Sequence, residues 1–189
     1  MELTSITPTP TMLRALAHPV RLRMLGLLRA DGPATATTLA TRLGLNTGAT
    51  SYHLRQLAQH GFVVEDSERG NGRDRWWRAA HRSTRTDEPG PGEAEAQENL
   101  DAYLQAVATI HTEQLQRAVE ERPLLPPEWR EAETFSDWMV RLTPKRARAL
   151  VDALAAVVED VEEDDAEEAA DFTVQISAFP QPGRLGGES

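Results

Sequence analysis

The 189-residue chain contains no cysteine and a single lysine. The absence of cysteine excludes disulfides, thiolate metal sites and cysteine nucleophiles, and it fits a reducing compartment. No apolar run approaches the ~20 residues that a membrane-spanning helix needs. The first twelve residues lack the basic-then-apolar layout of an export signal. We therefore expect a cytoplasmic protein with no membrane partner.

The sequence also lacks the usual motifs of catalysis. It has no Gly-rich phosphate loop, no nucleophile elbow and no paired-carboxylate site. The acidic run at residues 159–171 lacks the alternating ligands and central glycine of a calcium loop, so we interpret it as a solvated helix end. His53 is interpreted as a packed structural histidine. His111 is read as a core or dimer-interface histidine rather than a pH sensor or metal ligand. We predict no enzymatic activity, no metal site and no cofactor.

Charge is distributed unevenly along the chain, whose net charge is −10. Residues 1–82 hold 11 arginines against 6 acidic residues, whereas residues 83–189 hold 24 acidic residues against 9 basic ones. A basic half beside an acidic half indicates that the basic half meets a polyanion. Because arginine supplies nearly all the basic residues of this chain, a single arginine is weak evidence for nucleic-acid binding.

Apolar periodicity predicts four short helices before residue 61. The first covers residues 9–17, and the second runs from Pro19 to the "DGP" turn. The third covers residues 35–43 and the fourth residues 46–60, with only "GLN" between them. Two short helices joined by a three-residue turn that contains glycine form a helix-turn-helix.

A basic hairpin is predicted directly after the fourth helix. Two β-prone runs, residues 62–65 and 75–79, flank "ERGNGRD", whose glycines permit positive φ at an arginine-rich tip. Trp76 and Trp77 are expected to pack against this hairpin rather than stack on bases. A helix-turn-helix followed by a basic hairpin is a winged helix, with the wing at residues 66–75.

The acidic half predicts a second region. Residues 83–92 have the composition of a linker, and a long amphipathic helix runs from Ala96 to Val119. A strand at 135–142, a helix that begins at Thr143 and an alternating strand at 171–179 follow.

The predicted fold class is therefore mainly α with small β (α+β). It comprises a winged helix-turn-helix domain followed by a long helix and a helix-strand-helix-strand C-terminal region. The domains are a DNA-binding domain at 10–82, a linker at 83–92, a dimerisation or regulatory region at 93–179, and flexible tails at 1–9 and 180–189.

Three motifs in order resemble the winged helix-turn-helix of ArsR-type bacterial transcriptional regulators. They are "LAHPVRLRML" at 16–25, "TSYHLRQL" at 50–57 with "HGFV" at 60–63, and "GRDRWWR" at 72–78. The resemblance covers roughly residues 10–80. It implies a homodimer whose recognition helices enter the major groove and whose wings lie along the backbone. The best-known members of that family sense metals through cysteine-containing sites, so this property does not transfer to a chain without cysteine.

The helix at 46–60 carries hydroxyls, amides and a guanidinium on its polar side. Such groups match the donors and acceptors of base edges in a major groove. The expected base-reading residues are Thr47, Ser51, Tyr52, Arg55 and Gln56.

A second set of residues is expected on the DNA backbone. Arginines of the wing and hydroxyls early in the third helix contact phosphates, which positions the protein without reading sequence. This set comprises Thr37, Thr38, Arg69, Arg73 and Arg75.

The sequence thus predicts a homodimeric, sequence-specific regulator of transcription that binds double-stranded DNA, and we expect a repressor. The alternative is a winged-helix module that binds proteins and not DNA; the basic character of residues 1–82 disfavours it. The C-terminal region either binds a small apolar effector or only locks the dimer, and both interpretations stay open.

Overall fold

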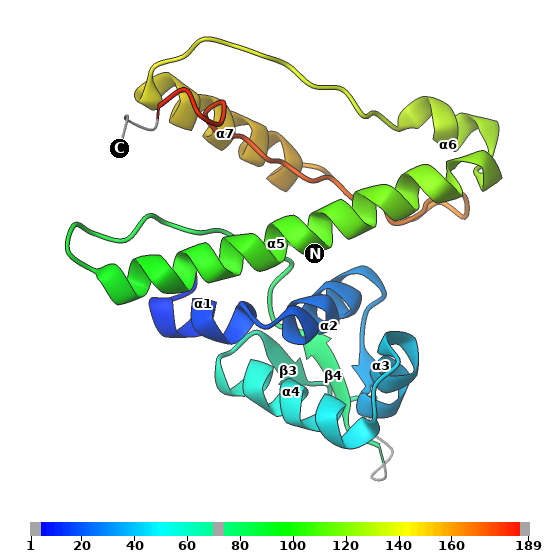
Figure 1. Cartoon of the computed structure of the whole chain (residues 1–189). Helices are drawn as coiled ribbons and strands as arrows, with labels where there is room; N and C mark the ends of the chain where they lie inside the picture. The colour runs from blue at the N-terminus through cyan, green and yellow to red at the C-terminus, as the bar shows by residue number, and fades with distance from the viewer. Residues whose placement is uncertain (1–4, 70–73, 186–189) are drawn as a thin grey trace. The chain divides into compact units, whose positions relative to one another are not determined.

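The computed structural model describes residues 5–69 and 74–185 (Figure 1). Contacts between Cα atoms divide the chain into two compact units, Met1–Pro123 and Leu124–Ser189. In the first unit, four short helices and a small sheet lie beside one long helix. The second unit contains two helices joined by extended segments. The fold is α+β, as predicted.

The four predicted N-terminal helices are confirmed to within one residue at each end. They are α1 (Pro10–Leu16), α2 (Pro19–Ala30), α3 (Ala36–Leu43) and α4 (Thr47–Gln59). Each begins at a side chain that accepts a backbone N–H; in α4 the Asn46 Oδ1 accepts from the Ala49 N–H at 2.8 Å. Helix α3 ends at Gly44, whose φ of 65° allows the sharp turn into α4.

The sheet of the wing has three strands in the order β2-β4-β3, all antiparallel. The predicted hairpin is confirmed as β3 (Val63–Glu65) and β4 (Trp76–Ala79). Strand β2 (Ala34–Thr35), just before α3, was not predicted, because two residues are too few to show an alternating pattern. The pairing of β2 with β4 holds the first residues of α3 beside the wing.

A second, parallel pair joins β1 (Ser5–Ile6) to β5 (Ser83–Thr84). From the sequence, these residues are expected in a flexible arm and in a linker. In the structure they pair with each other. The half-buried Ile6 packs against the hydrophobic core, which explains why this part of the arm is held in place. Arg29 supports the same region, since its Nε donates to the His81 carbonyl and its Nη2 to the Thr84 hydroxyl, each at 2.9 Å.

The core of the first unit lies where the helices meet the sheet, and it extends to α5 (Ala94–Glu121). Leu100 and Tyr103 of α5 join the same buried cluster as the residues of α1 to α4. Arg23 of α2 also forms an ion pair with Glu113 of α5, at 2.6 Å. From the sequence, α5 is expected to belong to the C-terminal region. In the structure α5 packs against α1 and α2. The buried hydrophobic residues of the winged helix are Leu13, Ala15, Leu16, Met24, Leu25, Leu28, Leu39, Ala40, Leu54, Leu57, Phe62, Val63 and Trp77.

The second unit differs most from expectation. Its helices are α6 (Pro127–Ala132) and α7 (Pro144–Glu159), which follow the 3-10 turn Arg122–Leu124. Helix α6 is absent from the elements predicted above; Pro127 stands at its first helical position, where its missing N–H costs nothing.

The two strands predicted at 135–142 and 171–179 are wrong. Neither segment has strand structure, and no residue between 124 and 185 has a ladder partner in the described structure. Alternation of side chains marks a segment that can present one apolar face, but a strand also needs a neighbour for its backbone hydrogen bonds.

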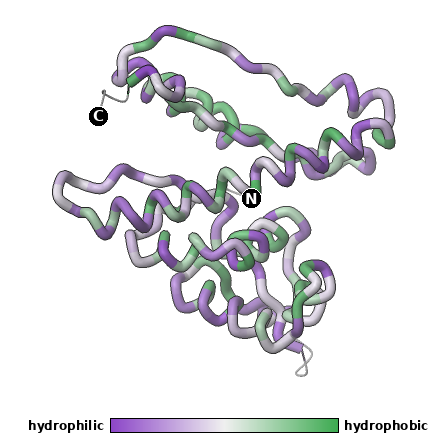
Figure 2. Tube along the Cα trace, viewed as in Figure 1, coloured by the Kyte–Doolittle hydropathy of each residue, from purple (hydrophilic) through white to green (hydrophobic). Residues whose placement is uncertain are grey.

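Hydrophobic residues recur along the helices of the first unit and make up much of α7 (Figure 2). Even so, within the described residues no helix combines the length and hydropathy required to cross a membrane.

Candidate nucleic-acid interface

Helix α4 presents one face to the core and the other to solvent. On the inner face Thr50, Leu54 and Leu57 are fully buried, and the Thr50 hydroxyl donates to the Asn46 carbonyl at 3.1 Å. On the outer face, Tyr52 is 51% exposed and Arg55 is also exposed. The inner contacts therefore anchor the helix while its polar side stays uncovered by the chain.

A hollow of about 290 Å³ lies beside this polar side. Three elements line it: the start of α3, the first half of α4 and the beginning of the second wing strand. Its lining residues are Thr35, Ala36, Thr37, Thr47, Ser51, Arg55, Asp74, Arg75 and Trp77. Residues far apart in sequence that were predicted separately to read bases or to hold phosphates thus meet at one place.

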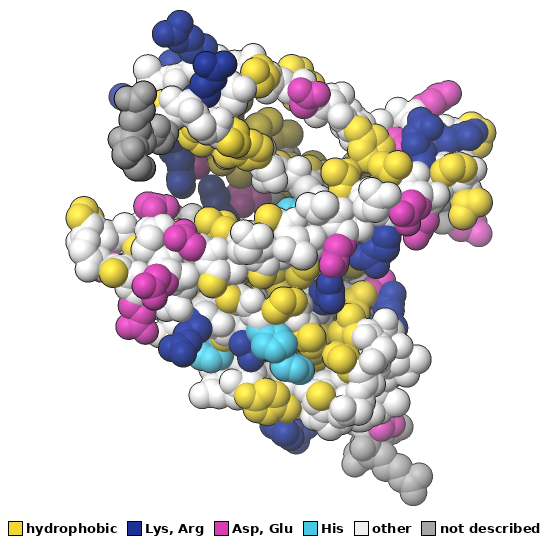
Figure 3. Space-filling model, in the orientation of Figure 1, with side chains coloured by type: hydrophobic (Ala, Val, Ile, Leu, Met, Phe, Trp, Pro, Cys, Tyr) yellow, Lys and Arg dark blue, Asp and Glu magenta, His cyan; other side chains and the backbone are white. Residues whose placement is uncertain are grey.

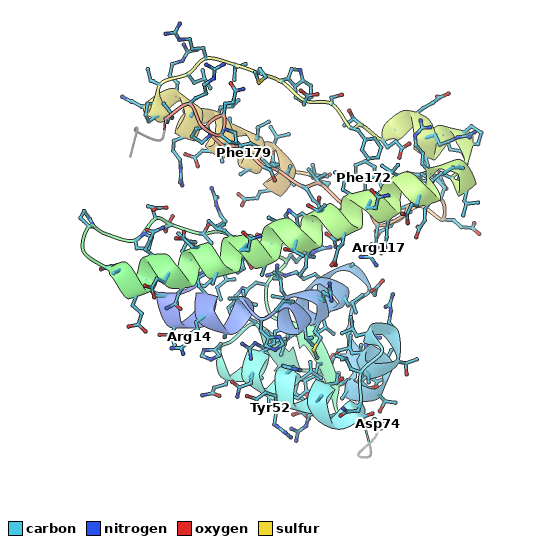
Figure 4. All side chains as sticks on the ribbon, in the orientation of Figure 1. Arg14, Tyr52, Asp74, Arg117, Phe172 and Phe179 are labelled. Carbon is cyan, nitrogen blue, oxygen red and sulfur yellow. The ribbon has the colours of Figure 1, made fainter. Side chains whose placement is uncertain are left out.

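The five predicted base-reading residues fall into two rows on α4. Thr47, Ser51 and Arg55 follow one another at intervals of four residues and line the hollow. Tyr52 and Gln56 form the neighbouring row and do not line it. Figure 4 labels Tyr52 on α4 and Asp74 at the wing, both on the side of the first unit away from α5.

Arginines of the wing are held by carboxylates of the same hairpin. Arg75 Nε lies 3.2 Å from Glu65 Oε2, and its Cζ lies 5.7 Å from the centre of the Trp77 ring. Arg69 Nε lies 3.6 Å from Asp66 Oδ2. Arg73, predicted as a third phosphate contact, lies outside the described residues.

These carboxylate partners were missed by sequence reasoning, which counted only the basic residues of the wing. In the hairpin register Glu65 lies opposite Trp77, two residues after Arg75. Knowledge of this register would have predicted the ion pair between Glu65 and Arg75. Asp74 adds another acidic side chain to the lining of the hollow. The wing is therefore less positive than its arginine count suggests.

Comparisons with known proteins found matches for the helix-turn-helix region of the chain. A helix-turn-helix domain family matches residues 16–66. Over 54 residues the chain is 46% identical to the HTH-type transcriptional regulator NmtR of Mycobacterium tuberculosis.

Residues 16–66 of the chain carry a helix-turn-helix domain. The match to NmtR covers 29% of this chain and 44% of that regulator, so it concerns the domain and not the whole protein. A solved structure of a Lactococcus lactis ZitR mutant in apo form is 15% identical. It aligns over 76% of this chain and 83% of that one, with a TM-score of 0.34.

Two residues predicted to contact the DNA backbone lie at the start of α3 in this helix-turn-helix domain. Thr37 is exposed and lines the hollow, as its predicted role requires. Thr38 is exposed too, but its hydroxyl lies 3.0 Å from that of Thr35, whose side chain caps the helix. Thr37 is therefore the residue of this pair that faces α4 across the hollow.

A pair of histidines joins α4 to the start of α2. The rings of His18 and His53 are 4.7 Å apart, and the buried Nδ1 of His53 has no hydrogen-bond partner in the described structure. Burial lowers the pKa of both, and the nearby charge of Arg21 lowers it further. In His18, Nδ1 accepts the Val20 N–H at 3.3 Å, so this residue begins α2 rather than ending α1.

His111 stands apart from this pair, half-buried on α5, where burial lowers its pKa. The part of the chain that the structure describes contains no group of three or more histidine, aspartate or glutamate side chains suited to a metal ion.

Proposed function

We propose that the protein is a sequence-specific, double-stranded-DNA-binding regulator of transcription that acts as a homodimeric repressor in the cytoplasm. The observation that carries this proposal is the hollow shared by α3, α4 and the wing. It gathers Thr37, Thr47, Ser51, Arg55 and Arg75 beside an uncovered helix face. A row of hydroxyls and a guanidinium on a rigidly anchored helix suits a groove lined by base edges.

The division of labour follows from position. Arg55, exposed at mid-helix, can bridge O6 and N7 of a guanine, and Gln56 in the adjacent row can pair with adenine. Thr47 and Ser51 lie in the first turns, where the helix N-terminus comes near the backbone and bases. Tyr52, exposed at its edge, suits packing on a sugar or a thymine methyl.

Phosphate contacts fall to the surrounding elements. Thr37 and Thr38 lie at the start of α3, while Arg69 and Arg75 lie on the wing. Because Arg75 is ion-paired with Glu65, a phosphate must compete with that carboxylate for the guanidinium. Such contacts raise affinity for all sequences alike.

A homodimer is proposed because one helix reads only a few base pairs, and a useful site needs two copies about one DNA turn apart, ~34 Å. The apolar faces of α1 and of α5 are the first candidates for the interface. The α1 face is covered by its own chain, since Leu13 and Leu16 are buried. The stripe that remains is on α5, where Leu104, Leu115 and Val119 are 45%, 51% and 48% exposed.

The name of NmtR, a transcriptional regulator, supports the proposal over a protein-binding module or an enzyme. The single most informative experiment selects bound sites from random double-stranded DNA with the purified protein. We expect two related half-sites in inverted orientation, about one helical turn apart.

Two arginine variants test the roles of individual residues. Arg55→Ala should lose roughly 5- to 150-fold of discrimination at one base position, which corresponds to ~1–3 kcal/mol. Arg75→Ala should weaken binding to all DNA alike, and Arg141→Ala, an exposed arginine outside the helices of the second unit, serves as a matched control that changes neither. If no sequence is enriched, or if Arg55→Ala and Arg75→Ala behave alike, the proposal fails.

A further inference from the structure

The C-terminal unit has no interior of its own. None of the described residues from 124 to 185 has a buried side chain. Large apolar side chains are exposed instead, among them Trp138 at 80%, Met139 at 79% and Phe179 at 71%. Large apolar side chains exposed in this number mark the unit as a candidate for interaction with a partner.

Helix α7 carries the most regular part of this surface. Leu150, Leu154 and Val157 recur at helical spacing and are 43%, 42% and 68% exposed; Val161, 60% exposed, continues the stripe just beyond the helix. The adjacent row on α7 is also apolar and only half-buried: Ala147, Val151, Ala155 and Val158. Hydrophobic side chains accordingly gather over α7 in the space-filling view (Figure 3).

The charges of α7 oppose its own dipole at both ends. Its first turn contains no acidic residue. Three basic residues lie in this turn or just after it: Lys145, Arg146 and Arg148. Its last turn contains no basic residue and leads into Glu159 and Asp160. Positive charge at a helix N-terminus and negative charge at its C-terminus both destabilise an isolated helix. The pattern is therefore not explained by the lone helix.

An antiparallel copy of the same helix removes both conflicts. We propose that α7 pairs antiparallel with α7 of a second copy of this chain, through the stripe of Leu150, Leu154 and Val157. The two-fold axis then passes beside Ala153, one residue before Leu154, and the basic start of each helix lies beside the acidic end of the other. In this register Arg146, at the edge of the stripe, faces the partner subunit's Asp160. A parallel pair would bring like charges together.

Charge also argues for a second copy rather than another helix of this chain. Helix α5 carries six acidic residues and one arginine, so it repels the acidic end of α7. Only a partner that is basic at one end and acidic at the other complements α7 along its whole length, and α7 itself meets that requirement. The pairing rests on the homodimer of the proposed function but does not require DNA binding.

The absence of cysteine makes the pairing directly testable by single-cysteine cross-linking in the full-length protein. On mild oxidation, Leu154→Cys should form a disulfide-linked dimer, because residue 154 lies one residue from the axis and close to its own copy. Ala156→Cys is the matched control: it is exposed and lies roughly 160° around the same helix, so it should not cross-link.

Sedimentation of the unmodified protein separates the outcomes. A dimer without a cross-link at position 154, or one that cross-links equally at 156, overturns the α7 pairing and leaves the homodimer standing. A monomer at the same concentration overturns both.

Charge reversal provides a second test in the Leu154→Cys background. Arg146→Glu should slow cross-linking roughly threefold to tenfold, because two symmetric ion pairs become repulsive. Adding Asp160→Arg should restore the rate, since the complementary charges are then exchanged. Lys145→Glu changes the net charge equally on the far side of α7 and should have little effect. If the double variant is no faster than Arg146→Glu alone, the antiparallel register is wrong.

Discussion

The ion pair between Glu65 and Arg75 makes a quantitative prediction for DNA binding. In the free protein the two groups lie 3.2 Å apart with side chains 50% and 59% exposed. Exposed pairs of this kind contribute about 0.2–1 kcal/mol. A phosphate that binds Arg75 must break this ion pair and lose its free energy. Removing the carboxylate charge should therefore strengthen DNA binding by the same amount of free energy.

The substitution is Glu65→Gln, which keeps the size of the side chain. We expect the dissociation constant to fall about 1.4- to 5-fold for every DNA sequence, because 1.4 kcal/mol corresponds to tenfold. Arg75→Ala should weaken binding to every sequence and should flatten the dependence of log K on log[salt] by about 0.9 per protomer. Fluorescence anisotropy with one selected and one scrambled duplex, over a range of salt concentrations, measures both quantities.

A double-mutant cycle decides whether the mechanism is correct. If Glu65 acts by holding Arg75, then Glu65→Gln should have no effect in the Arg75→Ala background. An undiminished gain in that background would show that Glu65 acts through its general negative field, and the proposed competition would be refuted. A gain confined to the selected duplex would likewise contradict a phosphate contact.

Three further predictions concern stability. Leu54→Ala, at a fully buried position of α4, should lower the free energy of unfolding by about 2–5 kcal/mol in urea titrations; a loss below 1 kcal/mol would mean that α4 is not anchored as described. Because burial lowers the pKa of His53 below its ordinary 6.5, the neutral form stabilises the fold above that pH, and stability should fall as the pH drops below 6.5. His53→Gln should flatten this dependence between pH 7.5 and 5, and an unchanged slope would contradict it. Burial lowers the pKa of Arg29 to about 10, so it stays charged at neutral pH; Arg29→Met should cost about 1.5–3 kcal/mol in thermal unfolding, and more than Thr84→Ala, which removes one of its two acceptors.

The winged helix was predictable because its signals are local. Pro19 at a first helical position, Asn46 as a cap and Gly44 in a left-handed turn each fix a boundary within a few residues of sequence. The elements that were missed are set by distant partners. Strands β1, β2 and β5 have two residues each, and their existence depends on pairing with segments 41 to 78 positions away.

The candidate site was predicted as a set of residues, but not as an arrangement. Periodicity placed Thr47, Ser51 and Arg55 on the outer side of α4, and this required only the spacing of Leu54 and Leu57. The acidic partners of the wing arginines depend on hairpin register and were not foreseen. In the C-terminal unit the alternation at 171–179 indicated an apolar face and nothing about what covers it, so the strand inferred there was wrong.

The parallel pair of β1 and β5 has a practical consequence for handling the protein. Ser5 and Ile6 are bound to the stretch by which the chain leaves the wing, and the Arg85 N–H donates to the Ile6 carbonyl at 2.9 Å. Trimming the amino end past Ile6 therefore removes the strand partner of β5, the segment that follows the wing more than seventy residues downstream. Recombinant versions meant to report native behaviour are better served by fusions at the opposite end.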